Sequence, residues 1–264
     1  MIGAIAGDII GSPYEFRPHK SVDFPLFSAG CRFTDDTVLT IALAEAILTD
    51  ADYAAVMKQY YLRYPDAGYG GRFRKWAVTT NSNPYRSFGN GAAMRISPVA
   101  FYYTTLEEVL VQAEAYTAVT HNHPEGIKGA QATAAAIFLA RNGSSKEEIK
   151  KYVTATFDYN LSRSCTHMRP DYKFDVTCQG SVPESITCFL ESSDYESTVR
   201  LAVSLGGDSD TQACIAGGIA EAFYGVPKWI EEKAQDYLDV DLLSVLLHFK
   251  SKVSSLSGKD RTTI

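Results

Sequence analysis

The stretch SLGGDSDTQACIAGGIAEAFYG, residues 204–225, places two aspartates directly before an apolar segment. Asp208 and Asp210 follow a pair of glycines, and the residues after them are mostly small and apolar. The segment ends at Gly225, with a proline two residues later, which is typical of a helix stop. We therefore predict a helix over residues 210–225 that begins at the acidic pair.

A second acidic pair stands far upstream, in the stretch RFTDDTVLT, where Asp35 and Asp36 lie between two threonines. This pair also opens an apolar stretch. Residues one or two positions apart do not share a helix face, so each pair is expected in the loop or first turn before its helix. Either pair alone is typical of simple helix capping, because Asp and Thr favour helix starts.

Taken together, the two pairs favour a metal site. Four carboxylates gathered in one place repel one another, and a divalent cation supplies the charge that removes this repulsion. Mg²⁺ and Mn²⁺ prefer carboxylate, hydroxyl and water oxygens, and Glu15 in GSPYEF offers one more carboxylate. The twelve-residue loop of an EF-hand, with its terminal Glu, is absent from the sequence.

The aspartyl-phosphatase pattern Asp-x-Asp-x-Thr is a second interpretation of DSDTQ. Thr211 comes one residue too early for that pattern. Its chemistry also needs a strand that leads into an α/β sheet, and alternating β-patterns are scarce here. We set this interpretation aside.

Helical periodicity dominates the rest of the chain and predicts an all-α fold with one domain over residues 1–264. Capping-box spacings occur at Thr105 with Glu108 and at Ser145 with Glu148. Loop-rich parts are expected at about 65–100 and 158–182. Pro183 is expected at a helix start. The predicted helices besides 210–225 cover residues 37–50, 52–64, 105–120, 124–141 and 145–157.

Composition limits the class of protein. The chain has 264 residues, 45% of them hydrophobic, and a formal net charge of −6, which argues against a broad grip on nucleic-acid phosphates. Its five cysteines form no C-x-x-C pair, which fits reduced thiols in the cytoplasm. No secretory leader or membrane span is expected, because Asp8 interrupts the apolar start and no apolar run approaches about 20 residues. Nothing marks a docking helix, so we expect a monomer.

Six segments, in this order, resemble the ADP-ribosylglycohydrolases, the group that includes the dinitrogenase-reductase-activating glycohydrolase and the ADP-ribosyl-acceptor hydrolases. Together they span about residues 1–227. One of them alone is weak, whereas the ordered set is highly specific. The segments are GAIAGDIIGSPYEF, FTDDT, GNGAAMRISP, HNHPEGIKGA, GSVPESITCFL and SLGGDSDTQACIAGGIAEAFYG.

The resemblance implies a compact orthogonal helical bundle with two divalent cations, Mg²⁺ or Mn²⁺. It also implies hydrolysis of the glycosidic bond between ADP-ribose and a modified acceptor, most simply a protein side chain, with ADP-ribose as product. By position, the implied metal ligands are Thr34, Asp35, Asp36, Asp208, Asp210 and Thr211. The implied catalytic residues are Glu15, Asp36 and Asp208.

The resemblance further implies a set of ADP-ribose contacts: Ser87, Phe88, Gly89, Asn90, Gly91, His121 and Ser209. Phe88 matches an aromatic that stacks on adenine in some relatives. Arg95 either pairs with phosphate or forms a salt bridge to an acidic loop. His123 stays unassigned, and Glu125 is interpreted as favouring a helix start.

Two other functions remain open from the sequence. One is another metal-dependent hydrolase of an ADP-ribose-like nucleotide. The other is a non-catalytic module that binds ADP-ribose. The acceptor is not readable from the residues, since arginine, serine, another residue, a nucleic-acid base and a small molecule all satisfy the pattern.

Overall fold

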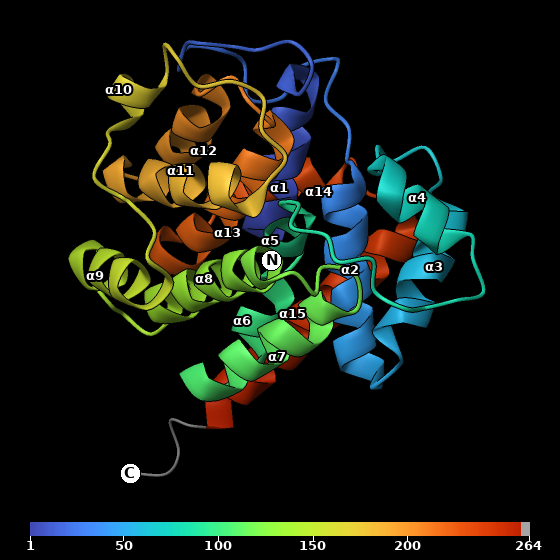
Figure 1. Ribbon diagram of the computed structural model, residues 1–264. Helices are drawn as coiled ribbons and strands as arrows, with labels where there is room; N and C mark the ends of the chain where they lie inside the picture. Colours follow the sequence, from blue (N-terminus) through green and yellow to red (C-terminus); the bar gives the residue numbers. More distant parts are fainter. Residues whose placement is uncertain (260–264) are drawn as a thin grey trace.

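The computed structural model describes residues 1–259 and shows helices without a β-strand over that range (Figure 1). The all-α prediction is therefore confirmed. One isolated antiparallel bridge joins Gly89 to Thr177. The helices pack around one hydrophobic core and form one compact domain. That this domain extends over 1–264 stays a prediction, since residues 260–264 lie outside the described part.

The helices differ widely in length, and the short ones lie mostly in the parts of the chain expected to be loops. They are α1 (Ile2–Gly11), the 3₁₀-helix η1 (Ser12–Tyr14), α2 (Asp35–Thr49), α3 (Tyr53–Arg63), α4 (Gly71–Ala77), α5 (Gly91–Met94), α6 (Ser97–Tyr102), α7 (Leu106–Ala118), α8 (Pro124–Arg141), α9 (Lys146–Phe157), α10 (Cys165–Met168), α11 (Cys178–Glu191), α12 (Tyr195–Ser204), α13 (Ser209–Tyr224), α14 (Lys228–Gln235) and α15 (Val240–Lys259).

Helix α13 is the centre of the molecule. It packs against α1, α8, α11 and α12, and its residues from Ser209 to Ala220 are all buried. Its contact with α1 is especially close because α1 presents a glycine every fourth residue. A Cβ atom at Gly7 would lie 2.1 Å from the carbonyl oxygen of Ala213, and one at Gly11 would lie 2.5 Å from that of Ser209. The missing side chains thus let the start of α13 reach the end of α1.

Several predicted helix starts are confirmed. Thr105 and Ser145 form capping boxes with Glu108 and Glu148, each pair satisfying two backbone donors. Pro124 is the first residue of α8, where its missing N–H costs nothing. The predicted helices therefore begin within two residues of the observed ones.

The prediction for Pro183 is wrong. Helix α11 begins at Cys178, capped by the hydroxyl of Thr177, which accepts a hydrogen bond from the N–H of Gly180 at 3.1 Å. Pro183 therefore lies inside the helix. The two loop-rich segments are also more helical than expected, since they contain α4, α5, α6, α10 and the start of α11. Short helices give too few residues for a periodic pattern to stand out.

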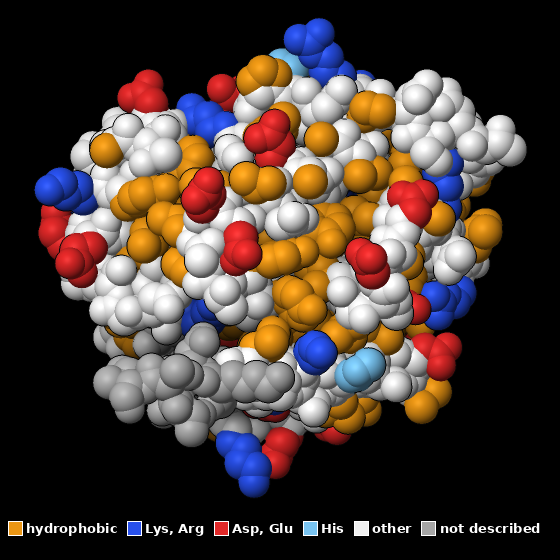
Figure 2. All heavy atoms as spheres, turned by 90° about the horizontal axis from the view of Figure 1, so that it is seen from below, with side chains coloured by type: hydrophobic (Ala, Val, Ile, Leu, Met, Phe, Trp, Pro, Cys, Tyr) orange, Lys and Arg blue, Asp and Glu red, His pale blue; other side chains and the backbone are white. Residues whose placement is uncertain are grey.

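Figure 2 shows the lower face of the molecule, where apolar side chains gather between scattered acidic ones. Helices α7 and α15 lie lowest in Figure 1, and they carry the exposed Val111 and Leu247. Among the described residues, no helix is both long enough and apolar enough to cross a bilayer.

Candidate active site

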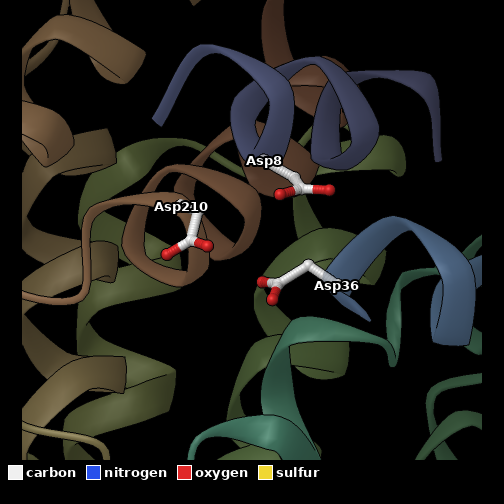
Figure 3. Close-up of side chains that lie close together, drawn as sticks. All are labelled: Asp8, Asp36 and Asp210. Atoms are coloured by element: carbon white, nitrogen blue, oxygen red, sulfur yellow. The ribbon is translucent and has the colours of Figure 1, made fainter. Parts of the chain in front are cut away.

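Carboxylates from three helices converge at one place in the core. Asp8 on α1, Asp36 on α2 and Asp210 on α13 point toward one another (Figure 3). One carboxylate oxygen from each lies within 4.8 Å of the other two. Glu15, Asp208 and Asp210 form a second group with the same spacing. Asp210 belongs to both groups and therefore stands between them.

Both acidic pairs occupy helix starts, as predicted. Thr34 is the N-cap of α2, and its hydroxyl accepts a hydrogen bond from the N–H of Asp36 at 3.3 Å. Asp208 is the N-cap of α13, and Asp210 lies in the first turn of that helix. The two helix starts meet because the hydroxyl of Thr211 donates to Asp36 Oδ2 at 3.3 Å.

Asp8 is a site residue that sequence reasoning missed. Its carboxylate is fully buried and accepts hydrogen bonds from Thr34 and Thr37, at the start of α2. The N–H of Thr34 donates at 2.9 Å, its hydroxyl at 2.7 Å and the N–H of Thr37 at 3.1 Å, and the hydroxyl of Thr37 donates as well. Four donors fill most of the acceptor positions of one carboxylate. Asp8 therefore holds the first turn of α2 in place beside α13.

Asp36 differs from Asp8 because one of its carboxylate oxygens has no hydrogen-bond partner among the described residues. It is 2% exposed, and its Oδ1 atom has no hydrogen-bond partner within the described residues. Burial, and next the nearby Asp210, raise the pKa of Asp36 well above its usual range. An unpartnered carboxylate oxygen inside a protein is costly unless something else binds it.

The second carboxylate group, Glu15, Asp208 and Asp210, accepts a hydrogen bond from Asn90. Asn90 donates from Nδ2 to Asp208 Oδ2 at 2.7 Å and to the hydroxyl of Ser181 at 3.2 Å. Burial raises the pKa of Asp208 to about 6, although the bond from Asn90 acts in the other direction. Burial and then the charge of Asp210 raise the pKa of Glu15 to about 8.

Asp35 lies apart from both groups, although it lines the same cleft. Its N–H donates to the carbonyl oxygen of Ala67 at 2.8 Å, which ties the start of α2 to the loop after α3. Thr34 is buried and turned toward Asp8. The structure thus places Asp36, Asp208 and Asp210 in the carboxylate groups, and it places Thr34 beside them.

The carboxylates form one wall of a cleft of about 450 Å³, a volume in the range of small-molecule sites. Thr211 lines this wall as well. Most of the ADP-ribose contacts implied by the resemblance lie on the same cleft, namely Ser87, Gly89, Asn90, Gly91 and His121.

Two of those implied contacts lie elsewhere. Phe88 does not line the cleft; its ring lies 5.2 Å from that of His123, measured between centroids. Ser209 is fully buried, and its hydroxyl donates to the carbonyl oxygen of Gly207 at 3.2 Å. Adjacent residues leave a loop or a first helical turn in different directions, so membership of a motif does not decide which ones face the cleft.

A second part of the cleft lining, here called the basic wall, is basic and aromatic. Arg72 and Arg74 of α4 line it together with Tyr85, Arg95 and His121. The guanidinium of Arg72 lies over the ring of Tyr85, 5.1 Å from its centroid. Sequence reasoning assigned no site to the segment that carries Arg72 and Arg74. Its aromatic-rich pattern favours a buried face followed by an ordered surface loop over a cleft rim.

His123 and Glu125 serve the start of α8. His123 is the N-cap, and its Nδ1 accepts a hydrogen bond from the N–H of Glu125 at 3.1 Å. Glu125 lies 3.8 Å from the ammonium of Lys128 on the same helix. The interpretation of Glu125 as a residue that favours the helix start is consistent with this arrangement.

The donor set fits hard divalent cations. Both carboxylate groups consist of oxygens alone, and threonine hydroxyls adjoin them. The unpartnered Oδ1 of Asp36 gives an independent reason for a cation, because none of the described residues donates a hydrogen bond to that atom.

Comparison with known proteins gives a consistent result. The family model described as ADP-ribosylglycohydrolase matches residues 1–253. ADP-ribosylhydrolase ARH3 of Homo sapiens is 25% identical, over 94% of this chain and 91% of that protein. ADP-ribosylarginine hydrolase Tri1 of Pseudomonas putida (strain GB-1) is 25% identical, over 89% of this chain and 73% of that protein.

A solved structure described as an ADP-ribosylglycohydrolase-related protein complex has the same fold. Its TM-score is 0.73 at 22% identity, and the match covers 96% of this chain and 97% of the other. The family model spans nearly the whole chain and contains both carboxylate groups. The chain therefore belongs to the ADP-ribosylglycohydrolase family, whose members are hydrolases of glycosyl bonds.

Proposed function

We propose that this protein uses two divalent cations, Mg²⁺ or Mn²⁺, to hydrolyse the glycosidic bond between ADP-ribose and a modified acceptor. The observation that carries the proposal is the pair of carboxylate groups that share Asp210 on the wall of a cleft. Asp210 belongs to both groups, so it would contribute to the binding of both cations of a two-metal centre.

The residues around Asp210 divide into ligands and supports. Asp36, Asp208 and Asp210 would hold the cations, with Glu15, Asp35 and the hydroxyls of Thr34 and Thr211 nearby. Asp8 and Asn90 are supports, because they bind the residues that carry the ligands. When bound, the cations would hold the vicinal hydroxyls of the distal ribose and lower the pKa of the attacking water.

The carboxylates that line the cleft also act on the substrate itself. Cleavage at C1 of the ribose passes through an oxocarbenium-like transition state, and Asp36 and Asp208, which line the cleft, would stabilise that positive charge. Glu15 lines the cleft beside Asp210 and is only partly buried. We assign it the proton transfer: it accepts the proton of the attacking water and returns one to the departing acceptor.

The basic wall is assigned to the nucleotide. A diphosphate needs donors and positive charge, which Arg72, Arg74 and the glycine loop around Gly89 supply. Tyr85 offers a flat apolar surface in the same wall. One relative is named for ADP-ribosylarginine, so a guanidinium-linked ADP-ribose is the first acceptor to test.

The test is a panel of defined ADP-ribosylated acceptors, incubated with Mg²⁺ or with EDTA. We expect release of ADP-ribose with an intact acceptor in Mg²⁺ and its loss in EDTA. Glu15→Gln should slow this release while largely retaining ADP-ribose affinity, because its role is in the transition state. Equal release in EDTA would refute the metal requirement.

Two competing functions predict different products. A hydrolase of another ADP-ribose-like nucleotide would release phosphate or a nucleotide fragment instead of ADP-ribose. A binding module would bind ADP-ribose and leave every acceptor intact. The complete oxygen-ligand groups favour catalysis over binding alone, since activating water needs charge that a simple binder does not.

We also propose that the protein is a monomer of the cytoplasm. All five cysteines are buried free thiols, which fits a reducing compartment. Light scattering coupled to size exclusion would measure the mass in solution. A dimer would contradict the proposal and would direct attention to the apolar lower face in Figure 2.

A further inference from the structure

Arg95 is a buried cation without an acidic partner. The residue is 2% exposed, and none of the ion pairs among the described residues includes it. Of the two roles left open by the sequence, the salt bridge to an acidic loop is therefore excluded within the described part of the chain. Burying a charge lowers the stability of the fold unless its hydrogen-bond donors find partners and other groups balance its charge.

Arg95 contacts His121 both directly and through Thr120. Its Nη2 atom donates to the hydroxyl of Thr120 at 2.7 Å and lies 3.2 Å from Nδ1 of His121. The hydroxyl of Thr120 in turn lies 2.8 Å from the same Nδ1. Guanidinium and hydroxyl therefore both face Nδ1 of His121.

The chemistry of these groups decides where His121 carries its proton. A guanidinium has only donors, so Nδ1 must be the acceptor of its hydrogen bond. The Thr120 hydroxyl accepts from Arg95 and can donate its single hydrogen to Nδ1. The guanidinium contact thus requires an unprotonated Nδ1, the hydroxyl contact is compatible with it, and the proton of the neutral imidazole then lies on Nε2.

Nε2 is the ring atom that faces the glycine loop. A Cβ atom at Gly91 would lie 3.3 Å from His121 Nε2, and one at Gly89 would lie 3.6 Å from it. Glycine at both positions leaves the approach to Nε2 open. Burial, and next the charge of Arg95, keep the pKa of His121 well below its usual range, so the ring stays neutral.

We propose that Arg95 is a positioning residue: with Thr120 it fixes His121 as the tautomer protonated on Nε2, which presents a fixed hydrogen-bond donor to an anionic oxygen of the ADP-ribose diphosphate. The ligand part of this inference rests on the proposed function, whereas the tautomer does not. The uncompensated charge of Arg95 favours an anion at this donor. Arg95 also lines the cleft, and in this proposal its effect on the ligand passes through His121.

The primary test is the tautomer itself. Long-range ¹H–¹⁵N correlation spectra of protein labelled with ¹⁵N-histidine distinguish a protonated ring nitrogen from a bare one. The chain has five histidines, so the signals of His121 are assigned by their loss in His121→Phe. We expect a bare Nδ1 and a protonated Nε2 in the unmodified protein at neutral pH. A proton on Nδ1 would overturn the proposal, whether or not ADP-ribose binds.

Two variants test whether Arg95 and Thr120 fix the tautomer of His121. Arg95→Met removes the cation at similar length, and Thr120→Val removes the hydroxyl at constant shape; each should mix the tautomers. Arg141→Met is the control, since Arg141 is a partly buried arginine that donates instead to the carbonyl oxygens of Phe101 and Tyr103. The control should leave the His121 signals unchanged. A fixed tautomer in both Arg95→Met and Thr120→Val would refute the role.

Calorimetry with ADP-ribose completes the test. Because only the fraction of His121 protonated on Nε2 can donate, a mixture of tautomers should weaken ADP-ribose binding about two- to threefold in Arg95→Met. In a His121→Phe background the same change should have no further effect, because the donor is already gone. An equal loss in both backgrounds would show that Arg95 acts without His121 and would overturn the proposal. If the tautomer is as expected but ADP-ribose binds to none of these proteins, the proposed function fails and the assigned diphosphate ligand fails with it.

Discussion

The two walls of the cleft are built in opposite ways. The acidic wall is made by α1 and by the first turns of α2 and α13, all packed into the core, with Asp8 and Asp210 almost fully buried. The basic wall comes from the short helices α4 and α5 and the loops around them. One wall is therefore acidic and set on helix starts that pack into the core, and the other is basic and built from short helices and loops.

This difference separates two tasks. Metal ions require ligands held at fixed distances, which buried helix starts supply. A nucleotide of several parts requires donors spread along its length, which loops supply more readily. Changes in the acidic wall should therefore abolish catalysis, whereas changes in the basic wall should weaken nucleotide binding.

The largest effect is expected at Asp210, the residue shared by both carboxylate groups. Asp210→Ala should lower the hydrolysis rate by more than about a thousandfold, as is common when a group that holds the reacting parts is removed. Added Mg²⁺ should restore little. The matched control is Asp194→Ala, because Asp194 begins α12 and its side chain accepts from the N–H of Ser197. A parental rate in Asp210→Ala would end the assignment.

A smaller effect is expected at Asp8, which supports the acidic wall. Asp8→Asn places an amide N–H₂ where donors from Thr34 and Thr37 now meet a carboxylate. We expect a loss of roughly 3 kcal/mol in the free energy of unfolding, since buried donors lose their partner. We also expect about 10- to 100-fold weaker metal binding, as for other supports of metal ligands.

Urea unfolding in EDTA and metal titration measure the two effects separately. A variant that binds metal normally after losing stability would show that Asp8 serves the fold alone.

The basic wall is tested at Gly91. A side chain in Gly91→Val would press on His121 Nε2, because a Cβ atom there already lies 3.3 Å away. We expect ADP-ribose to bind about tenfold more weakly, measured by calorimetry. Metal affinity should stay unchanged, which is the internal control. Weaker metal binding would show that the two walls do not act independently.

The smallest effect is the pH dependence of the metal-free protein. Burial raises the pKa of Glu15 from 4.5 to about 8 and that of Asp208 from 3.8 to about 6. A carboxyl whose pKa is higher in the folded chain binds more protons when folded. The stability from these groups is therefore full below about pH 4 and is lost as the pH rises to about 8.

We expect the unfolding temperature in EDTA to fall by a few degrees across this range, and the fall to shrink in saturating Mg²⁺. The same slope in both would contradict the cation site.

More of the residues in the acidic wall than in the basic wall could be predicted from the sequence. Asp36 and Asp210 were predictable because each belongs to an acidic pair at a helix start. Asp8 was not, since it stands alone in an apolar run and joins the site only because Gly7 and Gly11 let α1 approach α13 closely. A lone buried aspartate among small apolar residues is the signal that would have found it.

The basic wall depends on tertiary packing. Arg72 belongs to a seven-residue helix, too short for a periodic pattern, and its side chain reaches the cleft by lying over Tyr85. Phe88 shows the reverse, because the motif predicted a ligand contact and the chain turns its ring toward His123. The segments of the cleft were predictable, whereas the direction of each side chain was not.

The most direct test of the two-metal proposal is anomalous diffraction from crystals soaked in Mn²⁺. The account predicts two peaks roughly 3.5–4 Å apart, the spacing of other two-metal sites, one on each side of Asp210. In crystals of Asp210→Ala both peaks should be weak or absent. A single peak, or peaks away from Asp36, Asp208 and Asp210, would contradict the account.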